Sequence, residues 1–117
     1  MVNYELEHDV QNKIRIWCGE HNIPAFRANV IGGYTPDGRR VTSGLPNGFP
    51  DLIILLNNGK TIYVECKTLK GRAREDQKRL HADMRKRHHV VLMPRSLEQF
   101  IEEITPYIEE NQNGKDS

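Results

Sequence analysis

The chain has 117 residues, of which 37% are hydrophobic and 28% are charged, and its formal net charge is +1. This length favours one small domain with a single modest core and leaves no room for a second domain. No apolar stretch approaches the roughly 20 residues of a membrane span, and the N-terminus lacks the basic-then-apolar form of a signal peptide, so we expect a cytoplasmic protein with no membrane partner.

The first helix is predicted over residues 3–21. Glu7 lies within its apolar arc at a periodicity of 3.6 residues, whereas Glu5 and Glu20 lie outside it. An unpaired buried carboxylate is costly, so a metal ion or a basic partner would account for Glu7. The alternative is a first-turn carboxylate that interacts favourably with the helix dipole. Ile16 on the opposite face is a candidate oligomer contact, and the arc itself comprises Leu6, Val10, Ile14, Trp17 and Cys18.

Residues 25–30 are expected to form the first strand, and residues 31–50 a long irregular connection. This connection holds five of the nine glycines and three of the six prolines. A short hairpin is predicted within it at Pro36-Asp37-Gly38, which is a typical turn sequence. Loops of this length in a compact domain are often functional, and Arg39 and Arg40 fall at the tip of this one.

Two further strands are predicted on either side of a tight turn. Residues 52–56 form a continuous apolar run, and Asn57-Asn58-Gly59 then favours a hairpin. Residues 60–67 should form the returning strand, on which successive side chains point to opposite faces. One face then carries Ile62, Val64 and Cys66, and the other carries Tyr63, Glu65 and Lys67.

Pairing through a two-residue Asn58-Gly59 turn would bring Asp51, after Pro50, close to Glu65 and Lys67. Two carboxylates and a lysine that meet at the ends of neighbouring strands can assemble a divalent-metal site. The alternative is that Asp51 only follows a turn proline and that Glu65 and Lys67 form an ion pair on a solvated strand. Each motif alone is weak, but the two together, in this order and at this spacing, are much more specific.

The second helix is predicted over residues 73–87. Gln77 shares a stripe with Ala73, Leu80 and Met84 and should therefore face the sheet. Residues 89–93 are expected to form a buried strand. The last helix should open at Ser96, with Gln99 completing a capping box, and Pro106 should kink or end it.

Charge is distributed unevenly along the chain. Residues 67–87 contain nine basic and three acidic residues, a local balance of +6, which leaves −5 for the rest. A nucleic-acid backbone would be attracted to such a surface, although a basic stretch is also common on a merely solvated helix. The candidate DNA contacts among these basic residues are Lys70, Arg72, Arg74, Lys78, Arg79, Arg85 and Lys86.

The predicted order is helix, strand, strand, strand, helix, strand, helix. It is typical of an α/β domain with a mixed central sheet flanked by helices, here over residues 1–110. A polar tail over residues 111–117 should be disordered. Cys18 and Cys66 fall at inward-facing positions, which suits reduced thiols better than a disulfide partner.

The segments Gly48-Phe49-Pro50-Asp51-Leu52-Ile53 and Val64-Glu65-Cys66-Lys67, followed by Gln77, resemble the PD-(D/E)xK nuclease superfamily. Within it, the chain is most similar to the VRR-NUC (virus-type replication-repair nuclease) family in its small stand-alone, phage-like form. The similarity runs from about Glu7 to about Ile104. It implies a restriction-endonuclease-like fold and a metal-dependent endonuclease that cuts branched DNA, such as four-way (Holliday) junctions or flaps, in a bacterium or a phage-infected host cell.

The resemblance also implies roles for individual residues. Asp51 and Glu65 would bind Mg²⁺ or Mn²⁺, which prefer hard oxygen ligands, with the Cys66 backbone carbonyl as a third ligand. Lys67 would position the attacking water or stabilise the pentavalent state. The acidic residue of the first helix in the family pattern corresponds to Glu7, which would bind a second metal or an outer water. Gln77 would orient a ligand or the water; a glutamine bonded to backbone at the rim of an apolar face is the alternative.

DNA is the expected partner, bound by Lys70, Arg72, Arg74, Lys78, Arg79, Arg85 and Lys86 together with Arg39 and Arg40, unless the loop that carries these two arginines is functionally neutral. A homodimer is expected because symmetric resolution of a four-way junction needs two cuts, and two-fold symmetry supplies the second site. Two other functions fit the sequence: a sequence-dependent or nicking nuclease on duplex DNA, and a nuclease-fold DNA-binding protein without catalysis.

Overall fold

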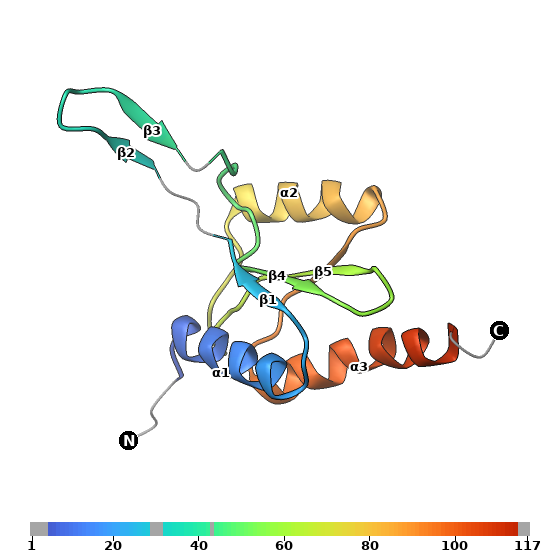
Figure 1. The fold of residues 1–117 in the computed structure, drawn as a ribbon. Coiled ribbons are helices and arrows are strands. Elements are labelled where there is room, and N and C mark those ends of the chain that lie inside the picture. Colours follow the sequence, from blue (N-terminus) through green and yellow to red (C-terminus); the bar gives the residue numbers. More distant parts are fainter. Residues whose placement is uncertain (1–4, 29–31, 43, 115–117) are drawn as a thin grey trace, which may run out of the picture.

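The computed structural model describes residues 5–28, 32–42 and 44–114. A four-stranded mixed sheet forms the middle layer (Figure 1). Helices α1 (Glu7–Glu20) and α3 (Leu97–Gly114) cover one face of this sheet, and α2 (Glu75–Lys86) covers the other. The predicted mixed sheet between helices is confirmed.

The strands of the main sheet lie in the order β1 (Ala25–Arg27), β4 (Leu52–Leu55), β5 (Thr61–Val64) and β6 (Val90–Leu92). The pairs β1–β4 and β4–β5 are antiparallel, and β5–β6 is parallel. The parallel pair requires a crossover, which α2 provides. Because α2 joins β5 to β6, its first turn lies directly after the loop that follows the Glu65-Cys66-Lys67 motif.

The hydrophobic core lies between the sheet and the helix pair α1 and α3. Alternate residues of β4 and β5 are buried on this side, as the strand periodicity predicted. Leu6 belongs to the predicted apolar arc of the first helix but not to the core, because it is the N-cap of α1 and is 63% exposed. The principal core residues are Val10, Ile14, Cys18, Leu52, Ile54, Ile62, Val64, Phe100 and Ile104.

The turn between β4 and β5 differs from the prediction in length. The Leu56 N–H donates to the Lys60 carbonyl at 2.9 Å, and Gly59 has φ +87°, so the loop has three residues and ends in a left-handed glycine. A two-residue Asn58-Gly59 turn is therefore wrong. The longer loop pairs Leu52 with Val64, one residue away from the predicted register.

The long connection contains the predicted hairpin. Strands β2 (Gly32–Tyr34) and β3 (Arg40–Thr42) pair only with each other, and the turn between them includes Gly38 at φ +89°. They form a narrow arm that projects away from the main sheet (Figure 1). The predicted element order was thus short by these two strands.

The last helix begins as predicted but continues further. The Gln99 N–H donates to Ser96 Oγ at 3.1 Å, while the Gln99 side chain accepts from the Arg95 N–H. The helix runs through Pro106 to Gly114, so the predicted end at Pro106 is wrong and residues 111–114 of the predicted tail are helical. Residues 115–117 lie outside the described residues.

Two expectations about the chain as a whole can be compared with the structure. Cys18 and Cys66 are both buried, and no disulfide joins them. No helix in the described ranges is long and apolar enough to cross a membrane.

Candidate active site

The three charged residues of the two strand motifs line one cavity of about 420 Å³. The three-residue loop is the cause, because extending the observed register by one pair sets Asp51 opposite Glu65, on the same face of the sheet. The predicted register would have set Asp51 opposite Cys66, on the other face. The complete lining is Glu7, Gln11, Arg27, Ala28, Asn47, Gly48, Phe49, Asp51, Glu65, Lys67, Arg74 and Gln77.

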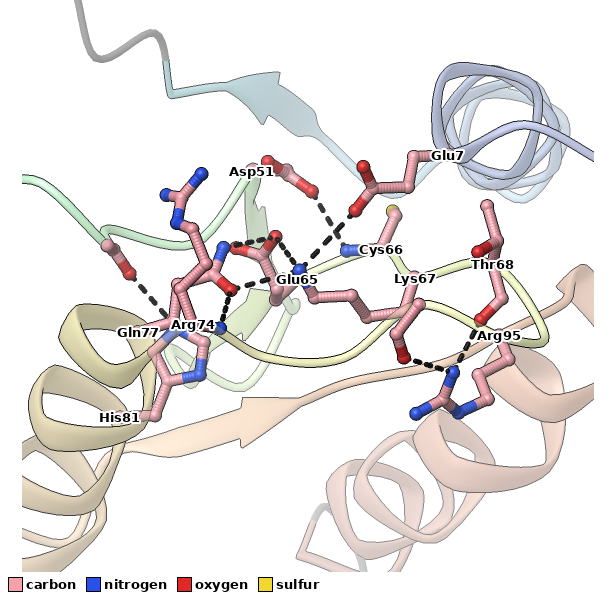
Figure 2. Close-up of polar contacts among 12 residues, drawn as sticks. Glu7, Asp51, Glu65, Cys66, Lys67, Thr68, Arg74, Gln77, His81 and Arg95 are labelled. Atoms are coloured by element: carbon pink, nitrogen blue, oxygen red, sulfur yellow. Dashed lines mark hydrogen bonds and ion pairs between the residues drawn. The ribbon is translucent and has the colours of Figure 1, made fainter.

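Gln77 connects Glu65 and Lys67, the two charged motif residues that follow β5 (Figure 2). Its Nε2 donates to Glu65 Oε2 at 3.0 Å, and its Oε1 accepts from Lys67 Nζ at 2.9 Å. Its Oε1 also accepts from the Arg74 backbone N–H at 3.0 Å. Gln77 is 4% exposed, so it faces the sheet as predicted, and both roles weighed from the sequence, side-chain orientation and backbone bonding, are present in its contacts.

Lys67 and Asp51 have further contacts at the same site. Lys67 Nζ lies 3.5 Å from Glu7 Oε1 and 3.7 Å from Glu65 Oε2. The backbone N–H of Cys66 donates to Asp51 Oδ2 at 2.9 Å, which fixes the Asp51 carboxylate against the end of β5. Figure 2 shows the four charged side chains pointing toward one another from three separate segments of the chain.

Burial makes the negative charge of this site costly. Burial is the main reason why the pKa of Glu65 rises to about 8, and the neighbouring Asp51 carboxylate raises this pKa further. Burial also raises the pKa of Asp51, against the lowering effect of the hydrogen bond from Cys66. Glu65 Oε1 is fully buried and has no hydrogen-bond partner. Such an acceptor is expensive to leave unsatisfied unless a cation or proton occupies its free side.

The donor set fits a hard divalent cation. Carboxylate oxygens are the ligands that Mg²⁺ and Mn²⁺ prefer, and an ion beside Asp51 and Glu65 would satisfy the unpartnered Glu65 oxygen. The described residues contain no group of three His, Cys, Asp or Glu side chains arranged to hold a metal ion. Mg²⁺ commonly keeps several waters and uses one or two carboxylates, so two carboxylates are sufficient for this type of ion.

Glu7 lies at the first position of α1 and lines the cavity, whereas Glu5 pairs with Lys13. The Glu7 side chain is 52% exposed, so it is at the rim and not inside an apolar face. The two interpretations of Glu7 from the sequence are both compatible with this place: it is a first-turn carboxylate and it has a basic partner, Lys67.

The loop before Asp51 packs closely against α2 through Gly48 and His81. His81 was not among the site residues predicted from the sequence. Gly48 has φ +88°, and a Cβ there would lie 2.8 Å from the Asp76 carbonyl oxygen. His81 Nε2 lies 3.1 Å from the Gly48 carbonyl oxygen, and His81 is 1% exposed. The spacing of four residues from Gln77 to His81 was a usable signal, because it sets both on one face of a helix.

The loop after Lys67 is held by Arg95, which the sequence analysis also missed. Its Nη1 donates to the carbonyl oxygens of Thr68, Leu69 and Gly71. The Lys67 N–H donates to the Pro94 carbonyl at 3.1 Å, so the same short segment holds both Lys67 and the loop that follows. No sequence motif marks Arg95, because its partners are backbone groups.

The predicted DNA-binding residues fall in different environments. Arg74 is the N-cap of α2 and lines the cavity. Arg85 is exposed, and its Nη2 donates to the Val91 carbonyl at 2.7 Å, which ties α2 to β6. Lys78 pairs with Glu75 at 3.4 Å, and Arg39 pairs with Asp37 at 3.1 Å. The remaining residues are exposed: Arg40, Lys70, Arg72, Arg79 and Lys86.

Asp51, Glu65 and Lys67 thus lie together at the ends of two adjacent antiparallel strands of the mixed sheet. Residues 38–93 match the family model of the VRR-NUC domain, and the resemblance drawn from the motifs is thereby confirmed. This segment holds both motifs and Gln77, and its similarity to the VRR-NUC domain indicates a nuclease of the PD-(D/E)xK type that acts on DNA. Glu7 and α3 lie outside the matched segment.

Two solved structures have a similar fold. One, described as "VRR_NUC domain", is 23% identical with a TM-score of 0.62 and covers 86% of this chain and 94% of its own. The other, described as "VRR_NUC domain protein", is 19% identical with a TM-score of 0.64 and covers 92% of each chain. No curated protein matches the chain. At these identities the two structures support the fold alone.

Proposed function

We propose that the protein is a divalent-metal-dependent, structure-selective endonuclease that hydrolyses phosphodiester bonds in branched DNA, such as four-way junctions or flaps. The observation that carries this proposal is the convergence of Asp51, Glu65 and Lys67 in one cavity, with one buried Glu65 oxygen left without a partner. Branched DNA as the substrate is supported by the resemblance to the VRR-NUC family.

Asp51 and Glu65 would hold Mg²⁺ or Mn²⁺, with the Cys66 backbone carbonyl as a further ligand. The bound ion would supply charge compensation for the phosphoryl oxygens and would lower the pKa of water. Asp51 is already oriented for this role by the Cys66 N–H, and Glu65 by Gln77. Glu7 would bind a second ion or an outer water.

Lys67 would act on the reacting groups directly. The residue is 6% exposed and its ammonium contacts Gln77 and Glu65, so it would donate to the attacking water or to the negative charge of the transition state. Preorganised donors in a water-poor site are effective because they need no rearrangement as charge develops. Gln77 acts through Lys67 and Glu65 and is a positioning residue.

Cleavage of a panel of end-labelled substrates tests the proposal. The panel contains a four-way junction, a flap, a linear duplex of the same sequence and a single strand, each with Mg²⁺, Mn²⁺ or EDTA. We expect metal-dependent cuts near the branch point of the junction or flap and little cutting of the duplex. Equal cutting of the duplex would favour the nicking or sequence-dependent nuclease, and binding without cutting would favour the non-catalytic alternative.

A further inference from the structure

Arg27 lines the cavity but belongs to neither sequence motif. It ends β1, where it pairs with Leu52 of β4. The next residue, Ala28, donates its N–H to the Asp51 carbonyl at 2.8 Å. The position of Arg27 relative to Asp51 is therefore fixed by the sheet and not by a flexible loop.

The Arg27 guanidinium has no acidic partner in the described parts of the chain, although three carboxylates line the same cavity. These carboxylates are those of Glu7, Asp51 and Glu65. Lys67 is the basic residue that they engage, and Gln77 also holds it. Three carboxylates against one lysine leave an excess of negative charge in the cavity, and Arg27 and Arg74 would offset it for an entering strand, together with the ion of the proposed function.

Arg27 and Arg74 approach the cavity from opposite faces of the sheet. Arg27 shares a face with its cross-strand partner Leu52, which packs in the core with α1 residues. Arg74 caps α2, which covers the other face (Figure 1). The Arg74 Nε contacts Asp76 at 3.3 Å, which leaves other guanidinium N–H groups available for a ligand.

We propose that Arg27 binds a backbone phosphate of the DNA next to the one that is cut, with Arg74 binding a phosphate on the other side. This inference rests on the proposed function and extends it to two residues that fix the path of the strand across the site. Guanidinium groups suit this task because their planar donors match phosphate oxygens bidentately. The alternative is that Arg27 is an ordinary exposed arginine, which adds only to the general positive field.

The test is a binding measurement that does not depend on cleavage. The full chain with Asp51→Asn is titrated into a fluorescein-labelled four-way junction and a labelled duplex, and the affinity is followed against salt concentration. Arg27→Gln and Arg27→Lys are added to this background. The matched control is Arg87→Gln, an exposed arginine at the opposite end of α2 from Arg74.

Each phosphate contact contributes about 0.9 to the slope of log affinity against log salt for duplex DNA. Arg27→Gln should therefore reduce the slope by about one and weaken binding to the junction and the duplex alike, on the order of tenfold. Arg27→Lys should keep the slope, and Arg87→Gln should leave both quantities unchanged. Equal effects of Arg27→Gln and Arg87→Gln, or a slope lost with lysine as well as glutamine, would overturn the proposal.

The two proposals fail in different ways. If the wild-type protein cuts none of the substrates but Arg27→Gln still reduces the salt slope, the catalytic proposal fails and the phosphate contact stands. If the wild-type protein cuts branched DNA and the Arg27 and Arg87 variants bind it equally, only the phosphate contact fails. Thermal unfolding of each variant, followed by circular dichroism, confirms that affinities are compared between folded proteins.

Discussion

Lys67 is buried beside two carboxylates and an amide, and its contacts explain why it can remain in place. The ammonium lies 2.9 Å from Gln77 Oε1, 3.5 Å from Glu7 Oε1 and 3.7 Å from Glu65 Oε2. A buried cation without such partners would be strongly destabilising. The same contacts hold the Lys67 ammonium in the cavity, where the proposed function requires its charge.

Asp51→Asn, Glu65→Gln and Lys67→Ala should each abolish detectable cleavage, a loss on the order of a thousandfold or more. The reason is that all three residues act on one cavity and no other described residue duplicates them there. The fold and DNA binding should be retained by Asp51→Asn and Glu65→Gln, because these amide substitutions preserve side-chain shape. Gel assays of cleavage and binding check both statements, and wild-type rates from an Asp51→Asn, Glu65→Gln double variant would refute the site.

Glu7 and Glu5 provide a comparison within the same helix start. Glu7→Gln should lower the cleavage rate by on the order of tenfold, as expected for lost support of a metal site or its partners. Glu5→Gln should have no effect on cleavage, because Glu5 contacts Lys13 and does not line the cavity. Single-turnover rates of the two variants measure this difference. Equal rates would mean that Glu7 has no role in the chemistry.

His81 should make stability sensitive to pH below neutrality. Its Nε2–H donates to Gly48, its Nδ1 is buried without a partner, and burial lowers its pKa below the ordinary 6.5. Because the pKa of His81 is lower in the folded than in the unfolded chain, neutral His81 contributes its full stabilisation of the fold above about pH 6.5. This contribution is lost as the pH falls toward the folded-state pKa, since the unfolded chain binds the proton first. The loss cannot exceed about 1.4 kcal/mol for each pH unit.

Urea unfolding of the wild type and His81→Gln between pH 7.5 and pH 5, values chosen on either side of the ordinary pKa of about 6.5, measures this contribution. Glutamine keeps a donor for Gly48 but does not titrate. The free energy of unfolding of the wild type should therefore fall toward that of the variant as the pH is lowered. Parallel pH profiles for the two proteins would show that His81 does not titrate in this range. Arg85 and Lys67, which also disfavour the charged imidazole, are present in both proteins.

At the scale of elements, the turn between β4 and β5 decides whether the two carboxylates meet. The sequence Asn57-Asn58-Gly59 predicted the hairpin correctly, but it accommodates loops of two or three residues. The choice between them shifts the register by one residue, which transfers Asp51 from one face of the sheet to the other. The prediction that Asp51 and Glu65 lie close together is confirmed, although the predicted turn would have separated their faces.

Other elements could be predicted because their signals are local. The α1 and β5 core residues follow simple periodicity, and the cap at Ser96 follows from its own sequence. Arg27 could not be selected in this way, and the spacing of His81 from Gln77 predicts only the helix face of His81, not its contact with Gly48. Their places depend on which strand is at the sheet edge and on how closely Gly48 approaches α2, and both are consequences of tertiary packing.

Gly48 and Gly59 allow two costs of replacing glycine to be measured separately: the left-handed backbone conformation and the steric clash of an added Cβ. Their φ angles are nearly equal, +88° and +87°, but a Cβ at Gly48 would meet the α2 backbone while a Cβ at Gly59 would meet nothing within 4 Å. Gly59→Ala should therefore cost about 1 kcal/mol, the penalty for the left-handed conformation. Gly48→Ala should cost about 3 kcal/mol, because overpacking adds to it, and should also reduce cleavage. Urea unfolding and cleavage assays test the pair; equal destabilisation would contradict the close packing.

At the scale of the whole molecule, the chain is more extended than its length requires. Its radius of gyration is 16.0 Å, compared with about 13 Å for a compact domain of this size. The β2–β3 arm and the long helix α3 account for this shape (Figure 1). An isolated two-stranded hairpin is marginally stable in water, so an arm of this kind is expected to gain order from a partner. The turn sequence Pro36-Asp37-Gly38 predicted the hairpin but not its projection from the domain.

The last prediction is that the working form is a homodimer. The chain contributes one cavity with both carboxylates, whereas symmetric resolution of a four-way junction needs two cuts on opposing strands, and a two-fold axis supplies the second site at a fixed separation. Ile16 is a candidate contact, since it is 62% exposed on α1 and borders a shallow hollow with Asn12 and Arg15. The glycine-rich segment of residues 31–50 is a second candidate.

Light scattering at micromolar concentration should give about twice the mass of one chain, and Ile16→Glu should reduce it toward the mass of one chain, because a charge would be buried at the contact. Paired incisions of a junction should occur within the lifetime of one complex, which a supercoiled cruciform plasmid reports as linear product formed without free nicked circles. A monodisperse monomer that still cuts junctions in symmetric pairs would refute the dimer. A monomer that makes single cuts in flaps would instead identify the protein as a flap nuclease, with one site sufficient for its substrate.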